Sequence, residues 1–332
     1  MSLISVIGAG SWGTALAFSL ASAGHSVRLW AHEAEVVDYI RVHRENRLFL
    51  PGFELPSSIS PTTDLREAAE GAEFILTVMP SHFCRSIYEQ MLPALNANMV
   101  FVSATKGLET ESLLRMSQVI REVLGTRFSP RLTVLSGPSF AREVANGDPT
   151  AVVVASEQAE DACLVQNLFS SKALRLYTSA DVVGVELGGA IKNVIAIAAG
   201  VVDGLALGHN AKAALITRGL AEMTRLACAC GGRRETLAGL AGMGDLVLTC
   251  TGSLSRNRSV GVELGRGKKL AEILGSMHEV AEGVKTTGAT VTLARSYRIE
   301  MPITEKVHLL LRGDTSPREA IRELMDRSLK NE

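Results

Sequence analysis

A glycine-rich turn near the start of the chain constrains the fold more than any other feature. The segment Gly8–Gly13 (GAGSWG) directly follows the apolar run Leu3–Ile7 and opens a helical pattern. A strand, a glycine turn and a helix N-terminus in this order create a pyrophosphate site, because free backbone amides and the helix dipole attract the anion. In such a turn Gly8 permits the tight bend, Gly10 lets the phosphates approach the backbone, and Gly13 lets the helix pack closely on the strand. We therefore predict a dinucleotide-binding site at this turn.

The composition is typical of a soluble enzyme with two domains. The chain has 332 residues, 46% of them hydrophobic, which is enough for two cores. Its formal net charge of -1 and its lack of a basic tract argue against nucleic-acid binding. The sequence begins with a strand pattern rather than a leader, and no uninterrupted apolar stretch is long enough to span a bilayer. We expect a cytoplasmic protein with no nucleic-acid partner and no membrane insertion.

Cysteine and histidine usage predicts neither a disulfide framework nor a metal site. The five cysteines are odd in number and include no CxxC pair, as expected in a reducing compartment. The seven histidines are scattered, and none lie four residues apart, the spacing that places two ligands on one helix face. We therefore assign no metal.

The first half of the chain alternates short apolar runs with helical stretches. Nearly continuous apolar strands separated by helices indicate a parallel sheet that is buried on both faces. After about residue 179 the pattern changes to successive helices rich in Ala, Leu and Gly, with no further strand run. We predict an α/β, Rossmann-type doubly wound parallel sheet in residues 1–179 and an all-helical domain in residues 180–332. The strand runs are Leu3–Ile7, Val27–Trp30, Phe74–Met79, Met99–Ser103, Leu132–Leu135, Ala151–Val154 and Leu174–Tyr177.

Ligands of an open parallel sheet bind outside the carboxyl ends of its strands. The second predicted strand ends without the acidic residue that usually binds the ribose 2′-hydroxyl of NAD. Arg28 and His32 flank this end, and Glu33 follows one residue later. A 2′-phosphate is therefore tolerated, so we expect NADP or NAD as the cofactor, with NADPH at least as suitable as NADH. An ordinary loop position for His32 remains the alternative.

Two later strand ends carry polar groups that suit an anionic or carbonyl ligand. Lys106 follows the fourth predicted strand and lies beside a glycine. Its place at the carboxyl edge of the sheet favours an anion- or carbonyl-binding role over that of a plain surface lysine. The next strand leads into Ser136–Ala141 (SGPSFA), where backbone amides and the Ser139 hydroxyl can donate to a small polar ligand as a helix begins.

The helical half contains polar residues in otherwise apolar sequence. Lys192 and Asn193 interrupt a continuous hydrophobic helix pattern. Burial of an unpaired ammonium is costly and lowers the lysine pKa toward neutrality, which suits a general acid or base. A lysine whose head group reaches the surface is the alternative. Asp245 lies among glycines further on. Ser255–Arg258 (SRNR) offers hydroxyl, guanidinium and amide donors for a phosphate, or else forms a plain capped helix start.

Seven motifs, which contain most of these residues, together resemble the bacterial NAD(P)-dependent glycerol-3-phosphate dehydrogenase family. The motifs run in order through almost the whole chain. Ser139 stands where many family members have threonine, which keeps the hydroxyl. The motifs are GAGSWGTALA (8–17), ATKGLE (104–109), SGPSFA (136–141), ELGGAIKNVIAIAAG (186–200), GMGDLVLTCT (242–251), SRNR (255–258) and VAEG (280–283).

The resemblance implies reversible reduction of dihydroxyacetone phosphate to sn-glycerol 3-phosphate, which supplies phospholipid synthesis, and a helical domain like that of 6-phosphogluconate dehydrogenase. It also implies that Lys192 is the general acid or base and that Asp245 holds and tunes it. The implied cofactor-binding residues are Gly8, Gly10, Ser11, Trp12, Gly13, His32, Lys106, Ala141, Arg256, Val280 and Glu282. The implied substrate-binding residues are Lys106, Gly137, Ser139, Lys192, Asp245, Ser255, Arg256 and Asn257.

Two other functions fit parts of the sequence. A 3-hydroxyacid or 6-phosphogluconate dehydrogenase also combines a glycine fingerprint with a lysine and an asparagine in a helical domain. A non-catalytic NAD(P) sensor would bind the cofactor but would leave Lys192 and Asp245 without a purpose. The apolar helical domain also favours a homodimer.

Overall fold

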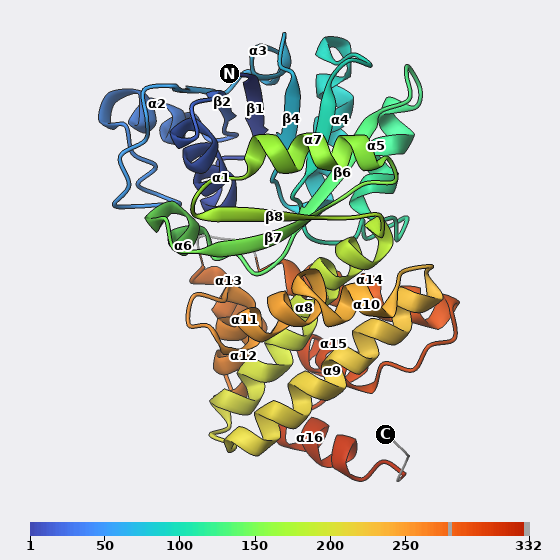
Figure 1. Ribbon diagram of the computed structural model, residues 1–332. Coiled ribbons are helices and arrows are strands. Elements are labelled where there is room, and N and C mark those ends of the chain that lie inside the picture. Colours follow the sequence, from blue (N-terminus) through green and yellow to red (C-terminus); the bar gives the residue numbers. More distant parts are fainter. Residues whose placement is uncertain (278–280, 329–332) are drawn as a thin grey trace. The chain divides into compact units, whose positions relative to one another are not determined.

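An eight-stranded sheet forms the framework of the first half of the chain in the computed structural model, which describes residues 1–277 and 281–328 (Figure 1). The strand order is β3-β2-β1-β4-β5-β6-β7-β8, so the chain leaves β1 first toward one edge and then toward the other. This order confirms the predicted Rossmann-type architecture. The strands are β1 Leu3–Ile7, β2 Ser26–Trp30, β3 Ile59–Thr62, β4 Phe74–Thr77, β5 Val100–Ser103, β6 Arg131–Ser136, β7 Thr150–Ala155 and β8 Leu174–Ser179.

Two features of the sheet differ from the sequence prediction. The edge strand β3 was not predicted, because Pro61 breaks its apolar pattern, and proline is tolerated only where its missing N–H is not needed. In addition, β6 and β7 pair antiparallel, whereas every other neighbouring pair is parallel. The connection between them holds only the six-residue helix α6 (Ala141–Asn146), which is too short to carry the chain back along the sheet.

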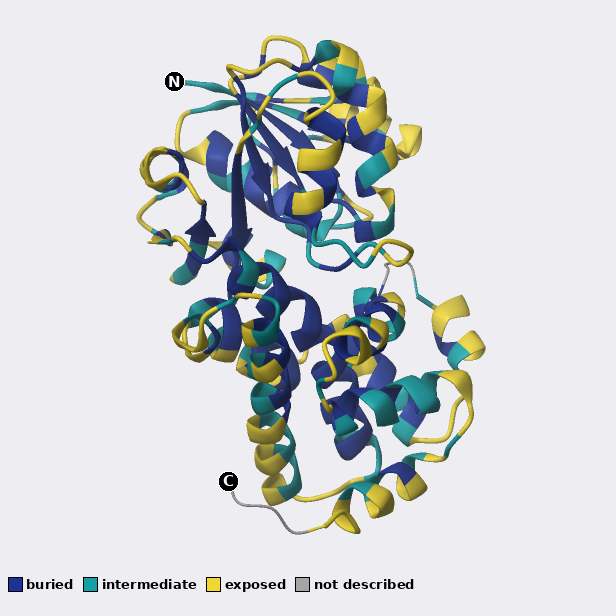
Figure 2. Cartoon of the chain, turned by 90° about the vertical axis from the view of Figure 1, so that its right-hand side faces the viewer, coloured by how far each residue is buried: buried dark blue, intermediate teal, exposed yellow. Residues whose placement is uncertain are grey.

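Helices cover both faces of the sheet, as expected for a doubly wound fold. Successive strand residues alternate between two cores: Phe74 and Leu76 of β4 face one, and Ile75 faces the other. Figure 2 shows the strands largely buried and the outward faces of these helices exposed. The first core packs against α1 (Ser11–Ser22), α2 (Ala34–His43) and α7 (Ala159–Phe169). The second core packs against α3 (Leu65–Ala69), α4 (Cys84–Met91) and α5 (Met116–Leu124), with short 3-10 turns at Ser81–Phe83 and Leu92–Ala94.

The described residues after Ser179 form helices and no strand, as predicted. The contacts divide the chain into two compact units: unit 1 holds Met1–Lys106 and Leu114–Glu186, and unit 2 holds Gly107–Leu113 and Leu187–Glu332. The division falls inside α8, so the boundary at residues 179–180 stays a prediction. The helices are α8 Val182–Gly204, α9 His209–Ala229, α10 Arg234–Ala238, the π-helical turn Leu240–Gly244, α11 Asp245–Thr251, α12 Arg256–Gly265, α13 Leu270–Gly275, α14 Glu282–Ser296, α15 Pro302–Arg312 and α16 Pro317–Met325.

Helix α8 is long and apolar enough to cross a membrane, contrary to the expectation that no segment would be. Its most apolar window is 94% buried inside the protein. The central helix of a globular core has the same length and composition, because it is surrounded by other apolar elements. The hydropathy of α8 is therefore weak evidence for a membrane span.

Candidate functional site

The glycine turn joins β1 to the N-terminus of α1 and packs against the end of β4. Gly8 has a φ of +118°, and a Cβ there would lie 2.5 Å from the Val78 carbonyl oxygen. A Cβ at Gly13 would lie 1.8 Å from the carbonyl oxygen of Gly8. A Cβ at Gly10, by contrast, would meet nothing within 4 Å. Gly8 and Gly13 are thus required by the fold, whereas Gly10, the N-cap of α1, has open space at its Cβ position.

Side chains near this turn occupy different environments. Ser11 and Trp12 are the first two residues of α1, and both are partly exposed. Trp12 also packs against two apolar clusters. Ala141 is the first residue of α6, which packs beside α1. These residues therefore lie at helix N-termini, where backbone amides are available to a ligand.

At the end of β2 the His32 side chain is exposed, whereas the Arg28 guanidinium is hydrogen-bonded to backbone carbonyls. Arg28 lies within β2 and donates from Nη1 to the Glu67 carbonyl oxygen at 2.8 Å and to that of Glu70. The charge of Arg28 therefore lies at the carbonyl end of α3, which it stabilises, and tolerance of a 2′-phosphate at this strand end stays a prediction. His32 and Glu33 are both exposed at this strand end.

Three predicted substrate-binding residues of unit 1 meet at neighbouring strand ends. Lys106 follows β5, and its Nζ donates to the Gly137 carbonyl oxygen at 3.1 Å. The Ser139 hydroxyl donates to the same oxygen at 3.0 Å. Gly137 has a φ of +146°, and a Cβ there would lie 2.9 Å from the Cα of Val152. Position 137 in the turn after β6 thus accepts only glycine. The Lys106 ammonium and the Ser139 hydroxyl both donate to the carbonyl oxygen of this glycine.

In unit 2 the side chains of Lys192, Asp245 and Thr249 form a buried polar cluster. The Lys192 Nζ donates to Asp245 Oδ1 and, at 2.9 Å, to the Thr249 hydroxyl. The Lys192 side chain is 8% exposed and that of Asp245 is fully buried. The ammonium is therefore paired with Asp245, the residue that the family resemblance implies holds it. A buried pair of this kind holds the Nζ in one position, because loss of either partner leaves an uncompensated charge.

Thr249 was not identified as a site residue from the sequence. Its hydroxyl donates to the Asp245 carbonyl oxygen at 2.6 Å and accepts from Lys192. It lies four residues after Asp245 on α11, so both side chains share one helix face. This spacing was the available signal, but an isolated threonine in an apolar helix more often bonds to its own backbone.

A second buried network links Asn193, Asn257 and Gly283. Asn257 Nδ2 donates to Asn193 Oδ1 at 3.0 Å, and the Gly283 backbone N–H donates to Asn257 Oδ1 at 2.9 Å. The two asparagines meet because α8 and α12 are in backbone contact. A Cβ at Gly200 would lie 2.0 Å from the Arg258 carbonyl oxygen, and one at Gly261 would lie 2.0 Å from that of Ile197. Close packing of small residues thus brings the start of α12 beside the polar face of α8.

The start of α12 is a capped helix end with an exposed arginine. The Ser255 side chain is the N-cap and accepts from the Arg258 backbone N–H at 3.2 Å. Arg256 is exposed, whereas the guanidinium of Arg258 pairs with Asp203 at 2.7 Å. Of the two arginines in the SRNR motif, Arg256 is thus the better placed to reach a ligand. The capping function of Ser255, which the sequence left as an alternative, is present.

Of the two cofactor-binding residues predicted near residue 281, the structure describes Glu282 but not Val280. Glu282 is the first residue of α14 and is partly exposed. Val280 lies outside the described residues. The position of Glu282 next to Gly283 connects it through the backbone to the Asn257 network.

The Cys250 thiol is buried and has a raised pKa. Burial raises the pKa of Cys250 to about 12, although the charge of nearby Lys192 lowers it, so this thiol is not a nucleophile at neutral pH.

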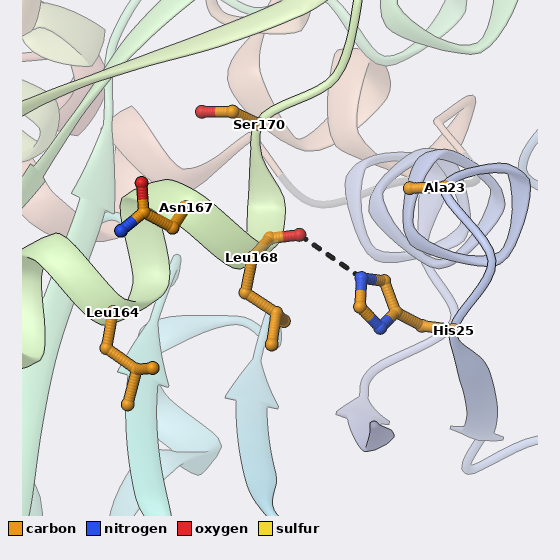
Figure 3. A pocket seen from close by; sticks show the side chains of 6 residues that line it. All are labelled: Ala23, His25, Leu164, Asn167, Leu168 and Ser170. Atoms are coloured by element: carbon orange, nitrogen blue, oxygen red, sulfur yellow. Dashed lines mark hydrogen bonds between the residues drawn. The ribbon is translucent and has the colours of Figure 1, made fainter. Parts of the chain in front are cut away.

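A shallow pocket between α7 and the turn before β2 is lined by His25 and Leu168 (Figure 3). The His25 Nδ1 accepts from the Ser2 backbone N–H at 3.3 Å, and Nε2 bonds to the Leu168 carbonyl oxygen at 3.2 Å. None of the predicted site residues lines this pocket. Among the residues described, no group of three or more metal-ligating side chains was found.

Comparisons with known proteins identify the family of the chain. Residues 3–162 match the N-terminal and residues 181–322 the C-terminal sequence profile of NAD-dependent glycerol-3-phosphate dehydrogenase. Glycerol-3-phosphate dehydrogenase (NAD(P)+) of Koribacter versatilis is 60% identical over 98% of both chains. The same enzyme of Geobacter sulfurreducens is 57% identical over 99% of this chain and 98% of the relative. The crystal structure of glycerol-3-phosphate dehydrogenase from Coxiella burnetii superposes with a TM-score of 0.94 at 43% identity, covering 98% of this chain and 99% of that one. With the glycine turn, the two-unit fold and nearly full-length similarity in agreement, the chain belongs to the NAD-dependent glycerol-3-phosphate dehydrogenase family.

Proposed function

We propose that the chain catalyses the reversible reduction of dihydroxyacetone phosphate to sn-glycerol 3-phosphate, with NADPH or NADH as the hydride donor. The buried Lys192–Asp245 pair is the observation that carries the proposal, because it is a proton donor held at a fixed position. Relatives of at least 57% identity carry the corresponding enzyme name. The product provides the glycerol backbone of phospholipids, so the chain supplies glycerophospholipid synthesis.

The cofactor fits the glycine turn of unit 1. The open space at Gly10, the close packing at Gly8 and Gly13, and the amides that begin α1 suit a pyrophosphate. The cofactor supplies hydride to the substrate carbonyl carbon. The residues that would hold it are Gly8, Gly10, Ser11, Trp12, Gly13, His32, Lys106, Ala141, Arg256, Val280 and Glu282.

Lys192 is the general acid of the reduction. As the carbonyl oxygen gains negative charge, the ammonium stabilises that charge and transfers its proton to the oxygen. Asp245 holds the ammonium in place, and Thr249 fixes its direction through the 2.9 Å hydrogen bond. In the oxidation direction the neutral amine accepts the hydroxyl proton of sn-glycerol 3-phosphate.

The remaining polar residues recognise the rest of the substrate. Lys106, Gly137 and Ser139 contact the three-carbon unit. Ser255, Arg256 and Asn257 bind the phosphate, because a guanidinium and neutral donors at a helix N-terminus match its geometry and charge. Lys192 and Asp245 complete the substrate-binding set.

Assembly and location are part of the same proposal. The exposed apolar side chains of Met243, Val247 and Leu254 favour a homodimer that buries such surface. We place the enzyme in the cytoplasm. We expect no insertion into a membrane, because the most apolar window of α8 is already 94% buried. Light scattering at assay concentration measures the dimer, and a monomer would contradict it.

A steady-state assay with dihydroxyacetone phosphate tests the function directly. We expect oxidation of both coenzymes, with kcat/KM for NADPH at least equal to that for NADH, because no acidic residue occupies the immediate end of β2. Absorbance at the reduced-nicotinamide band measures both rates. Turnover of a 3-hydroxyacid or of 6-phosphogluconate without turnover of dihydroxyacetone phosphate would support the other dehydrogenase, and absence of any hydride transfer would support the sensor. Strict dependence on NADH would contradict this interpretation of the end of β2.

Replacement of Arg256 by alanine tests phosphate recognition. The KM for dihydroxyacetone phosphate should rise about 10-fold or more, since charge-assisted hydrogen bonds contribute roughly 1.5–3 kcal/mol. At saturating NADPH, residual activity on unphosphorylated dihydroxyacetone should hardly change, because no phosphate is then present to bind. Arg266→Ala is a matched control, as Arg266 is an exposed arginine that follows the same helix. An equal loss with both substrates would assign Arg256 wholly to the cofactor.

A further inference from the structure

A buried asparagine between α2 and β3 is hydrogen-bonded to the glycine turn. Asn46 is only 1% exposed, although it lies in the long connection between α2 and β3. Its Nδ2 donates to the Ala9 carbonyl oxygen and to the Thr14 hydroxyl, each at 2.8 Å. Its Oδ1 accepts from the Phe49 backbone N–H at 3.2 Å. The Asn46 amide group therefore donates to the glycine turn at Ala9 and to the first turn of α1 at Thr14.

Thr14 completes the same arrangement from α1. Its hydroxyl donates to the Ala9 carbonyl oxygen at 3.1 Å while it accepts from Asn46. The Ala9 carbonyl thus accepts two hydrogen bonds from side chains. A carbonyl held by two buried donors has one orientation, and the peptide plane that contains it is fixed as well.

This peptide plane also contains the Gly10 amide. The described peptide bonds include no cis bond, so the Gly10 N–H points opposite to the Ala9 carbonyl. The carbonyl faces Asn46 and Thr14, so the N–H points away from both. A Cβ on Gly10 itself would meet nothing within 4 Å, so there is open space beside this residue. We propose that Asn46 is a positioning residue that, with Thr14, aims the Gly10 N–H at the cofactor pyrophosphate.

The connection that carries Asn46 is anchored by other contacts. Leu50 belongs to an apolar cluster with Ala15 of α1 and Val144 of α6. The rings of Phe18 and Phe53 pack edge to face, with centroids 6.2 Å apart. Because these apolar contacts hold the segment on α1, the polar side chain of Asn46 is not needed to attach it. Its two donors instead determine the direction of one peptide.

The inference rests on the proposed cofactor site, and direct NADPH binding tests it without the substrate. In Asn46→Leu and Thr14→Val, which keep side-chain size but remove the hydrogen bonds to Ala9, the NADPH dissociation constant should rise about 10-fold. At saturating NADPH, kcat and the KM for dihydroxyacetone phosphate should stay within about two-fold of the original values, because the substrate-binding residues are untouched. Thr14→Ser, which retains the hydroxyl, should restore most of the affinity that Thr14→Val loses.

Ser156→Ala controls for a general loss of stability. Ser156 is also buried in unit 1, but its hydroxyl donates to the Leu132 carbonyl oxygen of β6 at 2.8 Å and accepts from the Gln158 backbone N–H at 3.2 Å rather than from the glycine turn. This variant should lower the melting temperature without changing NADPH affinity. Folded Asn46→Leu and Thr14→Val proteins that bind NADPH as tightly as the original chain, or no more weakly than Ser156→Ala, would overturn the inference. If Asn46→Leu fails to fold, Thr14→Val decides alone. An unaltered chain that fails to bind NADPH would instead overturn the proposed function.

Discussion

Replacement of Lys192 by methionine should lower kcat for dihydroxyacetone phosphate by about 100-fold or more, the usual scale of general acid catalysis. Methionine keeps most of the side-chain volume but has no proton to transfer and no charge to stabilise the developing oxyanion. The dissociation constant for NADPH should hardly change, because the glycine turn that binds the pyrophosphate belongs to unit 1. Steady-state kinetics and equilibrium binding measure the two quantities separately.

The same substitution leaves the Asp245 carboxylate buried without its partner. Breaking a buried pair costs about 3–5 kcal/mol of stability, so part of an observed loss could come from unfolding. The double variant Lys192→Met with Asp245→Asn removes both charges and should recover stability but not turnover. Lys306→Met is a matched control, because Lys306 of α15 also pairs with a carboxylate, that of Glu323, outside the proposed site. Near-normal turnover in folded Lys192→Met would remove Lys192 from the catalytic role.

Replacement of Gly13 by alanine should lower the free energy of unfolding, whereas replacement of Gly10 by alanine should raise it slightly, although both glycines belong to one motif. In Gly13→Ala the new Cβ would lie 1.8 Å from the Gly8 carbonyl oxygen, and backbone on both sides cannot yield without separating α1 from β1. We expect a loss of about 3 kcal/mol or more, at the upper end of overpacking effects, or no folded protein. Thermal and urea unfolding measure this loss.

In Gly10→Ala the fold should be preserved. The backbone there has φ -65° and ψ 179°, which alanine adopts without strain, and the Cβ meets nothing within 4 Å. Reduced freedom of the unfolded chain should even add about 0.4–1 kcal/mol of stability. The Cβ would, however, occupy the space through which the phosphates approach the backbone, so NADPH should bind about 10-fold more weakly or worse. Unchanged NADPH affinity in Gly10→Ala would contradict the proposed cofactor position, and a stable Gly13→Ala would contradict the packing of the turn.

Local patterns in the sequence were sufficient for the glycine turn and most strands. The apolar run before Gly8 and the helical pattern after Gly13 identify the β1–α1 unit, because strand, turn and helix follow one another within about fifteen residues. The order of β1, β2 and β4 in the sheet then follows from the general topology of such units. The strand β3 was missed because its pairing with β2, rather than its own composition, makes it a strand.

The residues that carry the proposed chemistry were named from the sequence, whereas some of their contacts depended on the tertiary structure. The apolar surroundings of Lys192 favour burial, and the family resemblance implies its pairing with Asp245, 53 residues later, but its hydrogen bond to Thr249 was found only in the structure. Arg28 and Asn46 show the same limit. Charge suggested a phosphate for Arg28, which instead bonds to the carbonyls of Glu67 and Glu70, and nothing near Asn46 in the sequence indicated contact with Ala9. Sequence periodicity reports whether a side chain is buried, because burial follows from its own element. Which group it meets depends on how distant elements pack, and that is decided by the tertiary structure alone.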